Sequence, residues 1–412
     1  MGPRVLIIVE NLTLPLDRRV WQEATTLRDA GYTVSVICPV GGRYTARYEC
    51  LEGIHIFRHP LPIEADGALG YALEYGTALF WETVLTAKVA FKVGFDVIQG
   101  CNPPDTIFLI AGLYKVLFGT PFVFDHHDIN PELYEAKFGK RGFFHKLLLG
   151  LERMTFRTAD VSIATNEPFR EIALTRGRMP DDRVFIVRSI PDLSKFRRTT
   201  PNPALKNGRR HLIGYGGVMG AQDGVDLLVR AMDQIVRVEG RRDVQCAIVG
   251  RGTEVPHLKR LVGELGLEDY VTFTGYIPFE DFLAAYSTFD VGAIPDPKNT
   301  FNDKISMNKV FEYMTLGIPF VQFDLDEGRR IAGEAALYAS GNDPADLGRK
   351  LLMALDDEPL RARMKAAGQK ALASHVRWDI DRAELLAAYE TALAGGGRRG
   401  RVPAPATRAS MG

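Results

Sequence analysis

The stretch FNDKISMNKVFEYMTLGIPFVQFDLDEGRRIAG, residues 301–333, contains the clearest structural pattern in the chain. Apolar residues recur in it at helical spacing, which predicts a short helix with one buried face. We expect Ser306 to cap the N-terminus of this helix, and Gly317 followed by Pro319 to end it. The apolar run at 320–323 is then typical of a buried strand in a parallel sheet. The apolar positions of the helix are Met307, Val310, Phe311 and Met314.

Two lysines of this stretch, Lys304 and Lys309, stand where a positive charge is unfavourable if the helix begins near them. The macrodipole and the free N–H groups at a helix N-terminus favour an anion and disfavour a cation. A bound phosphate would resolve that conflict. The alternative is that both lysines are solvated, because the penalty at an exposed site is only about 0.3–1 kcal/mol.

Length and composition limit the class of protein. A chain of 412 residues exceeds the roughly 250–300 residues over which a single core grows, so two domains are expected. The 51 Lys and Arg residues balance 51 Asp and Glu residues, which removes a global electrostatic argument for nucleic-acid binding. The four cysteines form no C-x-x-C pair, and we expect reduced thiols of a cytoplasmic protein. The opening MGPRVLIIVEN becomes polar too early for a signal peptide.

Apolar strand-like runs alternate with helical patterns along most of the chain. A segment at 191–210, rich in Pro, Asn, Lys and Arg, separates two such series and is the expected linker. The fold class is therefore α/β, with two Rossmann-like parallel-sheet domains facing across a cleft. We expect the N-terminal domain at 1–200, the C-terminal domain at 205–378 and a disordered tail at 395–412. The runs lie at 5–9, 34–38, 97–100, 122–125, 161–164, 184–187, 212–215, 244–250, 271–274, 291–294 and 320–323.

Glycines follow two predicted strands of the second half. Gly216, Gly217 and Gly220 stand between a strand and a helix, where backbone amides can approach a phosphate closely. Gly250 follows the next strand, and Arg251 beside it would supply charge to a nucleotide. The alternative is structural in both places, with glycines serving tight turns and Arg251 facing solvent.

The segment FDHHD, residues 124–128, ends a predicted strand on the edge where parallel sheets bind ligands. His127 and Asp128 could hydrogen-bond a sugar hydroxyl or stabilise developing charge, while two histidines with two carboxylates also suit a metal. Neighbours in a strand point to opposite faces, so His126 and His127 are not expected to share an ion. A sugar or phosphate contact is therefore favoured over a metal.

Glu312 stands four positions after Asn308 and eight after Lys304. If the segment is helical throughout, the three side chains form a polar line beside the apolar stripe. A carboxylate in that line would accept hydrogen bonds from both hydroxyls of a ribose. On the residues alone, a surface glutamate ranks first.

Two segments raise the question of a membrane. Residues 67–94 are rich in apolar side chains, but Glu74, Glu82 and Lys88 interrupt them, so they do not form the run of about 20 apolar residues that spans a bilayer. Residues 138–157 combine Lys and Arg with Phe and Leu. Such a basic amphipathic stretch either rests on anionic lipid or presents an ordinary solvated face, and the second is the commoner case.

The run KVFEYMTLGIPFV, the paired glycines before an amphipathic helix, IVGRG and HHD together resemble the family-4 retaining glycosyltransferases of the GT-B fold. The opening NLTLPLDRRVWQEATTLRDAGYTVSVICP and the run DHHDINPELYEAKFG resemble bacterial members that build surface polysaccharide or exopolysaccharide. The resemblance extends from Val5 to about residue 394. It implies a nucleotide-sugar donor as co-substrate, a glycan or lipid-linked glycan acceptor, and no metal or other cofactor.

The resemblance also implies roles for particular residues. Glu312 matches the glutamate that holds the donor ribose, and His127 the histidine near the transferred sugar. Gly216 and Gly217 match the loop at the diphosphate. A last helix at 379–394 is expected to cross back onto the first domain.

Two positions depart from the family pattern. Lys304 stands where the first glutamate of the E-x7-E motif is expected, and the basic residues after the glycine loop are replaced in VMGAQDGVD, between Val218 and Asp223. Either Lys304 and Lys309 supply the missing charge, or catalysis is lost or changed. The predicted catalytic residues are His127, Asp128 and Lys304; the predicted donor-binding residues are Gly216, Gly217, Gly220, Arg251, Asn308, Lys309 and Glu312.

The sequence therefore predicts a cytoplasmic glycosyltransferase of polysaccharide biosynthesis, with a peripheral contact at the inner face of the membrane. A nucleotide-sugar epimerase on the same fold is the enzymatic alternative. A non-catalytic subunit of a glycan-assembly complex is the other, because of Lys304 and the altered loop.

Overall fold

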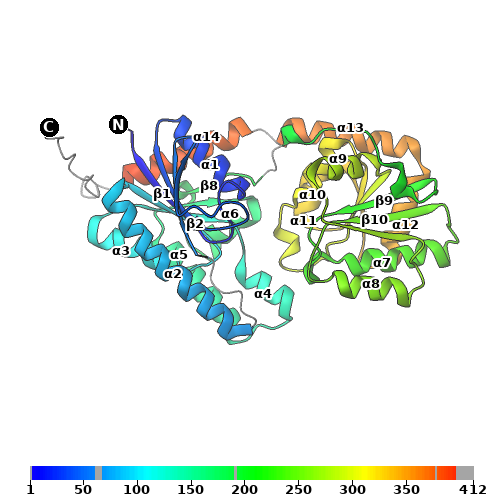
Figure 1. Cartoon of the computed structure of the whole chain (residues 1–412), viewed down its shortest axis with the longest axis horizontal. Helices are drawn as coiled ribbons and strands as arrows, with labels where there is room; N and C mark the ends of the chain where they lie inside the picture. The colour runs from blue at the N-terminus through cyan, green and yellow to red at the C-terminus, as the bar shows by residue number, and fades with distance from the viewer. Residues whose placement is uncertain (1, 61–66, 190–192, 376–377, 396–412) are drawn as a thin grey trace. The chain divides into compact units, whose positions relative to one another are not determined.

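The computed structural model describes residues 2–60, 67–189, 193–375 and 378–395, so the predicted tail lies outside the described residues except at its first position (Figure 1). The chain forms two compact units. The first contains the described residues up to 134, residues 140–189 and the helix that begins at Trp378; the second contains residues 135–139 and the described residues from 193 to 375. Phe196, which the sequence analysis placed in the first domain, is buried in the core of the second unit.

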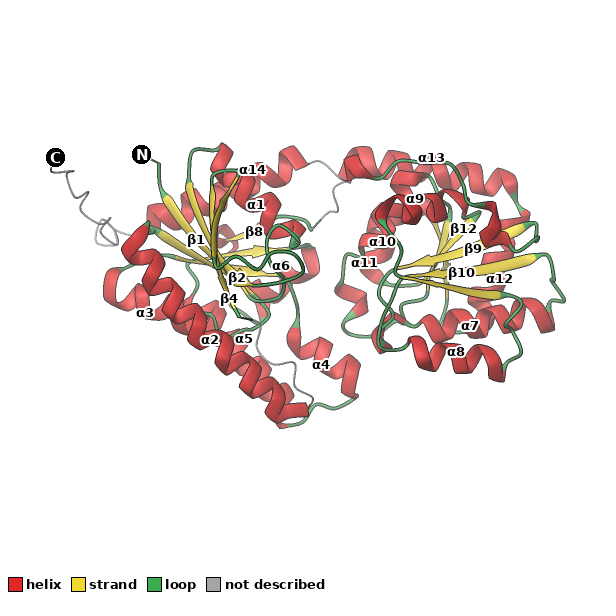
Figure 2. Ribbon diagram, in the orientation of Figure 1, coloured by secondary structure: helices red, strands yellow, loops and turns green. Residues whose placement is uncertain are grey.

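The first unit is built on an eight-stranded sheet whose order is β3-β4-β2-β1-β5-β6-β7-β8 (Figure 2). β3 pairs antiparallel with β4, and the remaining pairs are parallel. Without the β3 edge, the strands follow the doubly wound order with a reversal between β1 and β5. The strands are β1 (Arg4–Val9), β2 (Thr33–Pro39), β3 (Tyr48–Leu51), β4 (Ile54–His59), β5 (Val97–Cys101), β6 (Phe122–His126), β7 (Val161–Ala164) and β8 (Val184–Ile186).

Helices cover this sheet and bury its apolar strands. α14 (Trp378–Gly395) packs against α1 (Arg18–Asp29) and against β6, β7 and β8, so the C-terminal helix belongs to the first unit (Figure 1). α3 (Phe108–Phe118) packs against α5 (Phe143–Thr158), and both contact β6. The other helical elements of the unit are α2 (Gly67–Lys92), the first part of α4 (Asn130–Phe138), which passes into the second unit at Glu135, α6 (Glu167–Thr175) and the 3-10 turn η1 (Asp181–Arg183).

The second unit has a six-stranded, fully parallel sheet with the order β11-β10-β9-β12-β13-β14. This is the Rossmann order, and its reversal lies between β9 and β12, where such sheets bind ligands at the carboxyl ends of the strands. The strands are β9 (His211–Gly216), β10 (Val244–Val249), β11 (Val271–Gly275), β12 (Val291–Ile294), β13 (Phe320–Phe323) and β14 (Ala336–Ala339).

Two apolar clusters cover the two faces of this sheet. One includes residues of α7 (Val225–Asp233), α8 (Val255–Glu264) and α12 (Pro344–Asp356). The other includes residues of α9 (Phe279–Thr288), α10 (Asn308–Leu316) and α11 (Asp326–Ala332), and α13 (Glu358–His375) packs against it. The remaining elements are the 3-10 turns η2 (Leu193–Lys195), η3 (Pro203–Lys206), η4 (Ala221–Asp223), η6 (Asn302–Lys304) and η7 (Gly333–Ala335), and the π-helical turn η5 (Gln234–Val238). The predicted α/β class with two Rossmann-like sheets is confirmed.

The quoted stretch contains the predicted helix, α10, but the helix starts later than a continuous helical segment would require. Its apolar stripe is buried, Gly317 ends it with a left-handed φ of 59°, and β13 follows. Met307 is the N-cap residue, and Ser306 instead donates to Glu327 at 2.7 Å. The predicted Ser306 cap and the continuous polar line from Lys304 to Glu312 are therefore wrong, because residues 302–304 form a separate 3-10 turn.

Candidate functional site

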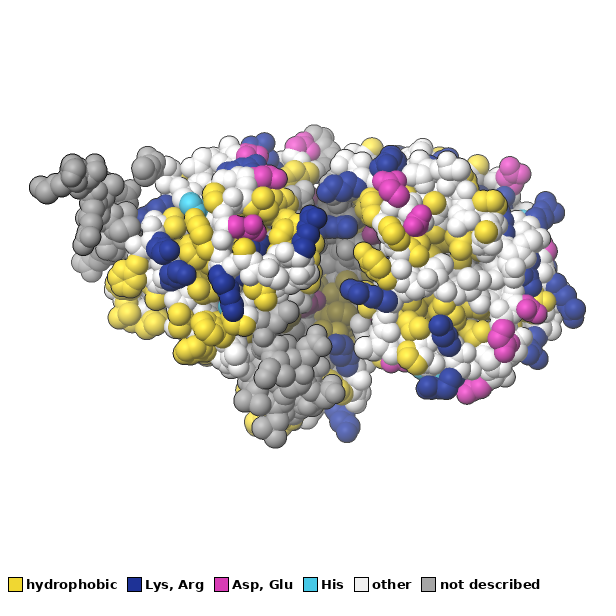
Figure 3. All heavy atoms as spheres, in the orientation of Figure 1, with side chains coloured by type: hydrophobic (Ala, Val, Ile, Leu, Met, Phe, Trp, Pro, Cys, Tyr) yellow, Lys and Arg dark blue, Asp and Glu magenta, His cyan; other side chains and the backbone are white. Residues whose placement is uncertain are grey.

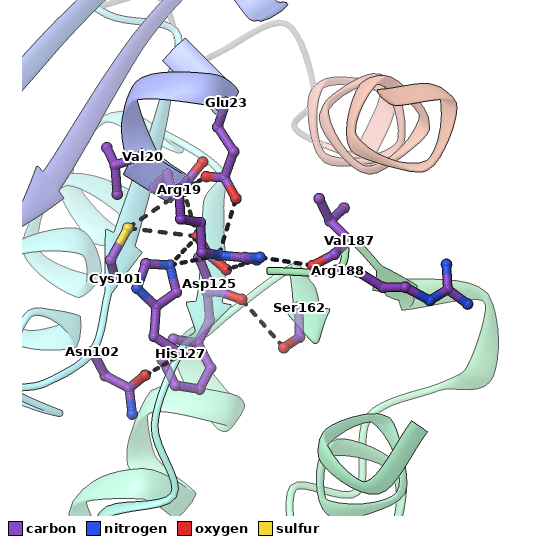
Figure 4. A network of polar contacts seen from close by, with 12 residues as sticks. Arg19, Val20, Glu23, Cys101, Asn102, Asp125, His127, Ser162, Val187 and Arg188 are labelled. Carbon is purple, nitrogen blue, oxygen red and sulfur yellow. Dashed lines mark hydrogen bonds and ion pairs between the residues drawn. The ribbon is translucent and has the colours of Figure 1, made fainter. Parts of the chain in front are cut away.

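The carboxyl ends of the strands in the first unit carry a buried polar cluster centred on Asp125 and His127 (Figure 4). Asp125 is on β6, and His127 directly follows that strand. Nε2 of His127 lies 2.5 Å from Oδ2 of Asp125. The backbone N–H groups of His127 and Asp128 donate to Oδ1 of Asn102, at 2.7 and 3.1 Å, which fixes the backbone after the strand.

Arg19 and Glu23, which the sequence analysis did not select, complete this cluster from α1. Nη2 of Arg19 donates to Oδ1 of Asp125 at 2.7 Å, and Nη1 of Arg19 donates to the carbonyl of Val187 at 2.7 Å. Nε of Arg19 lies 3.2 Å from Glu23, one helical turn further along α1. The i,i+4 spacing of two opposite charges was visible in the sequence, but it is equally common on solvated helices.

Burial and neighbouring charge set the protonation of the cluster. Burial raises the pKa of Asp125, but Arg19 and His127 outweigh burial and hold the pKa well below its usual range. Burial lowers the pKa of His127, and the charge and hydrogen bond of Asp125 more than reverse this, so the pKa lies above its ordinary value. Nε of Arg19 also lies 3.0 Å from Nε2 of His127. Nε2 cannot donate to Asp125 and accept from Arg19 at once. The carboxylate contact and the raised pKa assign it as a donor to Asp125.

Gln99 joins this cluster to the C-terminal helix. Its side-chain amide donates to Glu23 at 2.8 Å and to Asp125 at 3.0 Å, and its carbonyl oxygen accepts from the hydroxyl of Tyr389 on α14. Burial, followed by the charge of Asp125, raises the pKa of Glu23. These residues position the Asp125 carboxylate.

His126 points away from this cluster, as the alternation of a strand requires. Its buried ring lies among Phe124, Phe156 and Phe169. Burial, followed by the charges of Arg176 and His127, lowers the pKa of His126 to about 3, so the ring is neutral at pH 7. His126 is a core residue.

One group of possible metal ligands overlaps the cluster. Ligand atoms of Cys101, Asp125 and His127 lie within 4.8 Å of one another. The guanidinium of Arg19 already occupies the Asp125 carboxylate, and burial raises the pKa of the Cys101 thiol well above its usual value. A protonated thiol, and a histidine whose Nε2 already donates to Asp125, do not form a ready cation site beside an arginine.

A second such group among the described residues is Glu10, His59 and Glu82. Nε2 of His59 lies 2.9 Å from Glu10. Burial, followed by the charge of Glu10, raises the pKa of Glu82 to about 8, so this carboxyl is protonated at pH 7. The group therefore does not offer two ionised carboxylates.

In the second unit, the glycine loop after β9 packs directly on the loop after β10. A Cβ on Gly250, whose φ is 134°, would lie 1.9 Å from the carbonyl oxygen of Gly217. The N–H of Gly217 donates to Val249, that of Met219 to Arg251, and that of Gly220 to the Asp223 carboxylate. Three of the amides in the loop are thus already bonded within the protein, so Gly217 and Gly250 serve close packing of two backbones.

Lys309 lies beneath this loop in the first turn of α10, at the reversal point of the sheet. Its Nζ is 3.1 Å from Asp296, which follows β12, and 3.8 Å from Asp223. The ammonium also lies 4.8 Å from the centre of the Tyr215 ring. Burial lowers the pKa of Lys309, but Asp296, Tyr215 and Asp223 outweigh burial and raise it above its usual range. Lys309 is therefore a charged residue with two carboxylate neighbours, whereas the sequence analysis weighed only a phosphate or solvent as its partner.

Glu312 is connected to the glycine loop by the buried Tyr286. The hydroxyl of Tyr286 lies 3.1 Å from Oε2 of Glu312 and 3.4 Å from the carbonyl oxygen of Gly216. The ring of Tyr286 lies where a Cβ of Gly216 would stand, within 2.3–2.7 Å of that position. Two predicted site residues, Glu312 and Gly216, are thus held together by a residue that the sequence analysis did not select.

Three further predicted residues belong to the second unit. Asn308 is exposed at the first position of α10. Arg251 is exposed, with its guanidinium 5.3 Å from the centre of the Tyr276 ring. Nζ of Lys304 donates to the carbonyl of Thr300 at 2.9 Å, so part of its hydrogen-bonding capacity is used within its own turn.

Family comparisons agree with this geometry. The model of the family described as Glycosyltransferase Family 4 matches residues 16–194, and that described as Glycosyl transferases group 1 matches residues 210–357. The chain belongs to these glycosyltransferases, with one family model on each unit.

Individual relatives are distant but similar over most of their length. The alpha-D-kanosaminyltransferase of Streptomyces kanamyceticus is 22% identical over 74% of this chain and 80% of the relative. The 2-deoxystreptamine glucosyltransferase of the same organism is 25% identical over 82% of this chain and 89% of the relative.

Solved structures share the fold. A sucrose-phosphate synthase from Thermosynechococcus elongatus aligns with a TM-score of 0.75 at 17% identity, over 95% of this chain and 100% of that structure. Alr3699/HepE of Anabaena in complex with UDP-glucose aligns with a TM-score of 0.70 at 14% identity, over 95% of this chain and 100% of that structure.

None of the described helices combines the length and the apolar character that crossing a bilayer requires.

Proposed function

We propose that this glycosyltransferase moves a sugar from a nucleotide-sugar donor to a glycan or lipid-linked glycan, with retention of the anomeric configuration and without a metal. The observation that carries the donor assignment is the connection of Glu312 to Gly216 through Tyr286 at the reversal point of the second sheet. A carboxylate beside a glycine loop suits a ribose hydroxyl pair next to a diphosphate.

Charge on the leaving group is the main electrostatic demand of this reaction. Departure of a nucleoside diphosphate leaves negative charge that a fixed cation stabilises. Lys309 is assigned this role because its ammonium is charged and lies beneath the loop. Asp296 and Asp223 keep the ammonium in place and reduce its net field, so the proposed donor phosphate shares Lys309 with two carboxylates.

The polar cluster of the first unit is assigned to the sugar. Nε2 of His127 donates to Asp125, so the other ring nitrogen is left for a sugar hydroxyl. That nitrogen accepts from the hydroxyl when the ring is neutral and donates to it when the ring is charged. Arg19 and Asn102 hold the carboxylate and the backbone that orient this ring. Asp128 stays a proposed member of the site through its backbone contact with Asn102.

Names of relatives support the acceptor class only broadly. Relatives include a D-inositol 3-phosphate glycosyltransferase of Stackebrandtia nassauensis, 25% identical over 95% of this chain and 92% of the relative. They also include an O-antigen chain mannosyltransferase B of Escherichia coli, 25% identical over 57% of this chain and 58% of the relative. A role in polysaccharide biosynthesis, at the cytoplasmic face of the membrane, is part of the proposal.

The test is to incubate the protein with UDP-, GDP- and dTDP-sugars and to measure release of the nucleoside diphosphate. Glu312→Gln should lower kcat/KM for the active donor at least tenfold, whereas the exposed Glu334→Gln should not. The product anomer, read by NMR, tests retention. Binding without turnover for every donor would favour the non-catalytic subunit, and an altered nucleotide sugar formed without acceptor would favour the epimerase.

A further inference from the structure

The first unit contains a hollow of about 740 Å³ whose lining does not include Asp125 or His127. It lies at the amino ends of β7 and β8, because Asp160 directly precedes β7 and Arg183 directly precedes β8. Asp125 and His127 lie at the opposite, carboxyl edge of the same sheet. We call this cavity the arginine hollow. It is lined by Arg153, Phe156, Arg157, Ala159, Asp160, Arg176, Gly177, Arg178, Met179, Pro180, Arg183 and Gly395.

Five arginines and a single aspartate line the arginine hollow. Arg176 is held by Glu132 at 2.8 Å and by Glu152 at 2.5 Å, so its charge is compensated. Asp160 is likewise paired with Lys115 at 2.9 Å. The lining therefore keeps a strong excess of positive charge, although the whole chain is neutral.

Three of the lining arginines lack a protein partner within the described residues. Among the described residues, no side chain or backbone group forms an ion pair or a side-chain hydrogen bond with Arg153, Arg157 or Arg178. All three are exposed and line the hollow. Arg153 and Arg157 stand one turn apart on α5, and Arg178 lines the same hollow from the segment after α6. Guanidinium groups present paired donors that match the oxygens of a phosphate.

An exposed apolar surface adjoins this hollow. The helix α3 exposes 85% of Val116 and 61% of Leu117, together with parts of Leu109, Leu113 and Phe118. Lys115 on the same helix donates to the carbonyl of Thr158 at the end of α5, and pairs with Asp160 in the lining. We call Leu109, Leu113, Val116, Leu117 and Phe118 the apolar row of α3. Lys115 connects this row to the arginine hollow.

The neighbouring helix α5 has the same mixed character. Its exposed face carries Phe143, Phe144, Leu147 and Met154 beside Lys146, Arg153 and Arg157. Apolar side chains with basic ones among them gather over the region of α2 and α3 in Figure 3. Apolar area flanked by basic residues is the pattern that binds anionic lipid surfaces.

We propose that the arginine hollow binds a phosphate group, and that its source is the headgroup of an anionic lipid on whose surface the apolar rows of α3 and α5 rest. The headgroup phosphate accepts hydrogen bonds from Arg153, Arg157 and Arg178, and the apolar rows contact the acyl region. This binding is independent of the nucleotide-sugar site and is measured without donor or acceptor.

The experiment compares vesicles of phosphatidylcholine with vesicles that also contain phosphatidylglycerol, in a flotation or sedimentation assay. Arg153→Gln/Arg157→Gln/Arg178→Gln should reduce binding to the anionic vesicles at least tenfold. The matched control Arg242→Gln/Lys259→Gln/Arg260→Gln removes the same charge from exposed positions of the second unit and should retain binding. Arg176 is left unchanged because it holds two glutamates.

Two further arms separate the sources of phosphate. Val116→Ser/Leu117→Ser should weaken vesicle binding while it leaves the arginines intact. Calorimetry with inorganic phosphate and glycerol 3-phosphate measures the headgroup chemistry alone. Equal vesicle binding by the triple arginine variant and its control would overturn the site. Tight binding of soluble phosphate without any preference for anionic vesicles would overturn the lipid assignment.

Discussion

Arg19 Nη2 lies 2.7 Å from Oδ1 of Asp125, and both side chains are almost completely buried. Breaking a buried ion pair from one side leaves an uncompensated charge, which costs about 3–5 kcal/mol. Arg19→Met should therefore lower the free energy of unfolding by about that amount. The neighbouring exposed Arg18→Met is the matched control and should stay within about 0.5 kcal/mol of the unchanged protein. Chemical denaturation followed by fluorescence measures both, and equal stability of the two variants would contradict the assigned role of Arg19.

The charge of Asp125 should control the titration of His127. Without that charge, burial is the dominant influence and favours the neutral ring. Asp125→Asn should move the pKa of His127 from above its ordinary value of about 6.5 to below it. The exposed Asp29→Asn should leave the titration unchanged. NMR of the histidine ring protons across pH 5–9 reads the shift, and an unmoved His127 resonance would show that another group sets its pKa.

Glu82 should make the stability of the first unit depend on pH. Its folded-state pKa of about 8 is above the ordinary value of 4.5, so between these values the unfolded chain releases a proton that the folded chain keeps. The protonated Glu82 carboxyl contributes its full share to the free energy of unfolding at pH values below 4.5, the pKa of this group in the unfolded chain. This contribution falls by about 1.4 kcal/mol per unit as the pH rises toward the folded pKa.

Glu82→Gln should remove this loss, so the variant should gain stability over the unchanged protein at pH 8 and differ little at pH 4.5. The exposed Glu171→Gln should show no such pH-dependent gain. Thermal unfolding at the two pH values is the measurement. A gain of the same size at both would mean that Glu82 acts through packing and not through its proton.

Gly250 should tolerate no side chain. A Cβ there would lie 1.9 Å from the carbonyl oxygen of Gly217, and the φ of 134° is unfavourable for alanine. Overpacking of this kind costs about 1–3 kcal/mol, to which the backbone strain adds. Gly250→Ala should destabilise the second unit and weaken binding of the active nucleotide. Gly263→Ala on α8, whose added Cβ would meet its nearest neighbour at 3.6 Å, should be neutral or slightly stabilising. Calorimetry of unfolding and of nucleotide binding compares the two variants. Equal stability and equal nucleotide affinity of Gly250→Ala and Gly263→Ala would refute the close contact between Gly250 and Gly217.

Tyr286→Phe should raise KM for the donor clearly and lower the free energy of unfolding only slightly. The ring that supports Gly216 remains, but the hydroxyl 3.1 Å from Glu312 is lost, a hydrogen bond worth about 1 kcal/mol. Tyr313→Phe is the matched control, because its hydroxyl donates to the carbonyl oxygens of Gly214 and Ala293. Steady-state kinetics with the active donor compares the two. Equal effects on KM would argue against Tyr286 as the residue that positions Glu312.

The strands that sequence analysis found are those with continuous apolar runs, such as Val5–Val9 and Phe320–Phe323, since both faces of a parallel sheet are covered. It missed three strands. Residues of β3 alternate between exposed and half-buried, β4 has His55, Arg58 and His59 among its apolar residues, and β14 is short. The start of α10 was misplaced because the Asn302–Lys304 turn has the composition of a first helical turn. Only the backbone hydrogen bonds distinguish this separate 3-10 turn from a first turn of α10.

The sequence by itself determined the two Rossmann-like sheets, the buried stripe of α10 and the glycine turn at Gly216, because periodicity and glycine position are local properties of the chain. The resemblance to family-4 glycosyltransferases, and not periodicity, gave Glu312 and His127 their predicted roles. Tertiary structure alone decided which side chains meet them. Arg19 reaches Asp125 across 106 residues, and Tyr389 reaches Gln99 across 290. Tyr286 joins Glu312 to Gly216, and Asp296 approaches Lys309 from another strand end. These contacts depend on the order in which strands lie side by side, and no local pattern in the chain specifies that order.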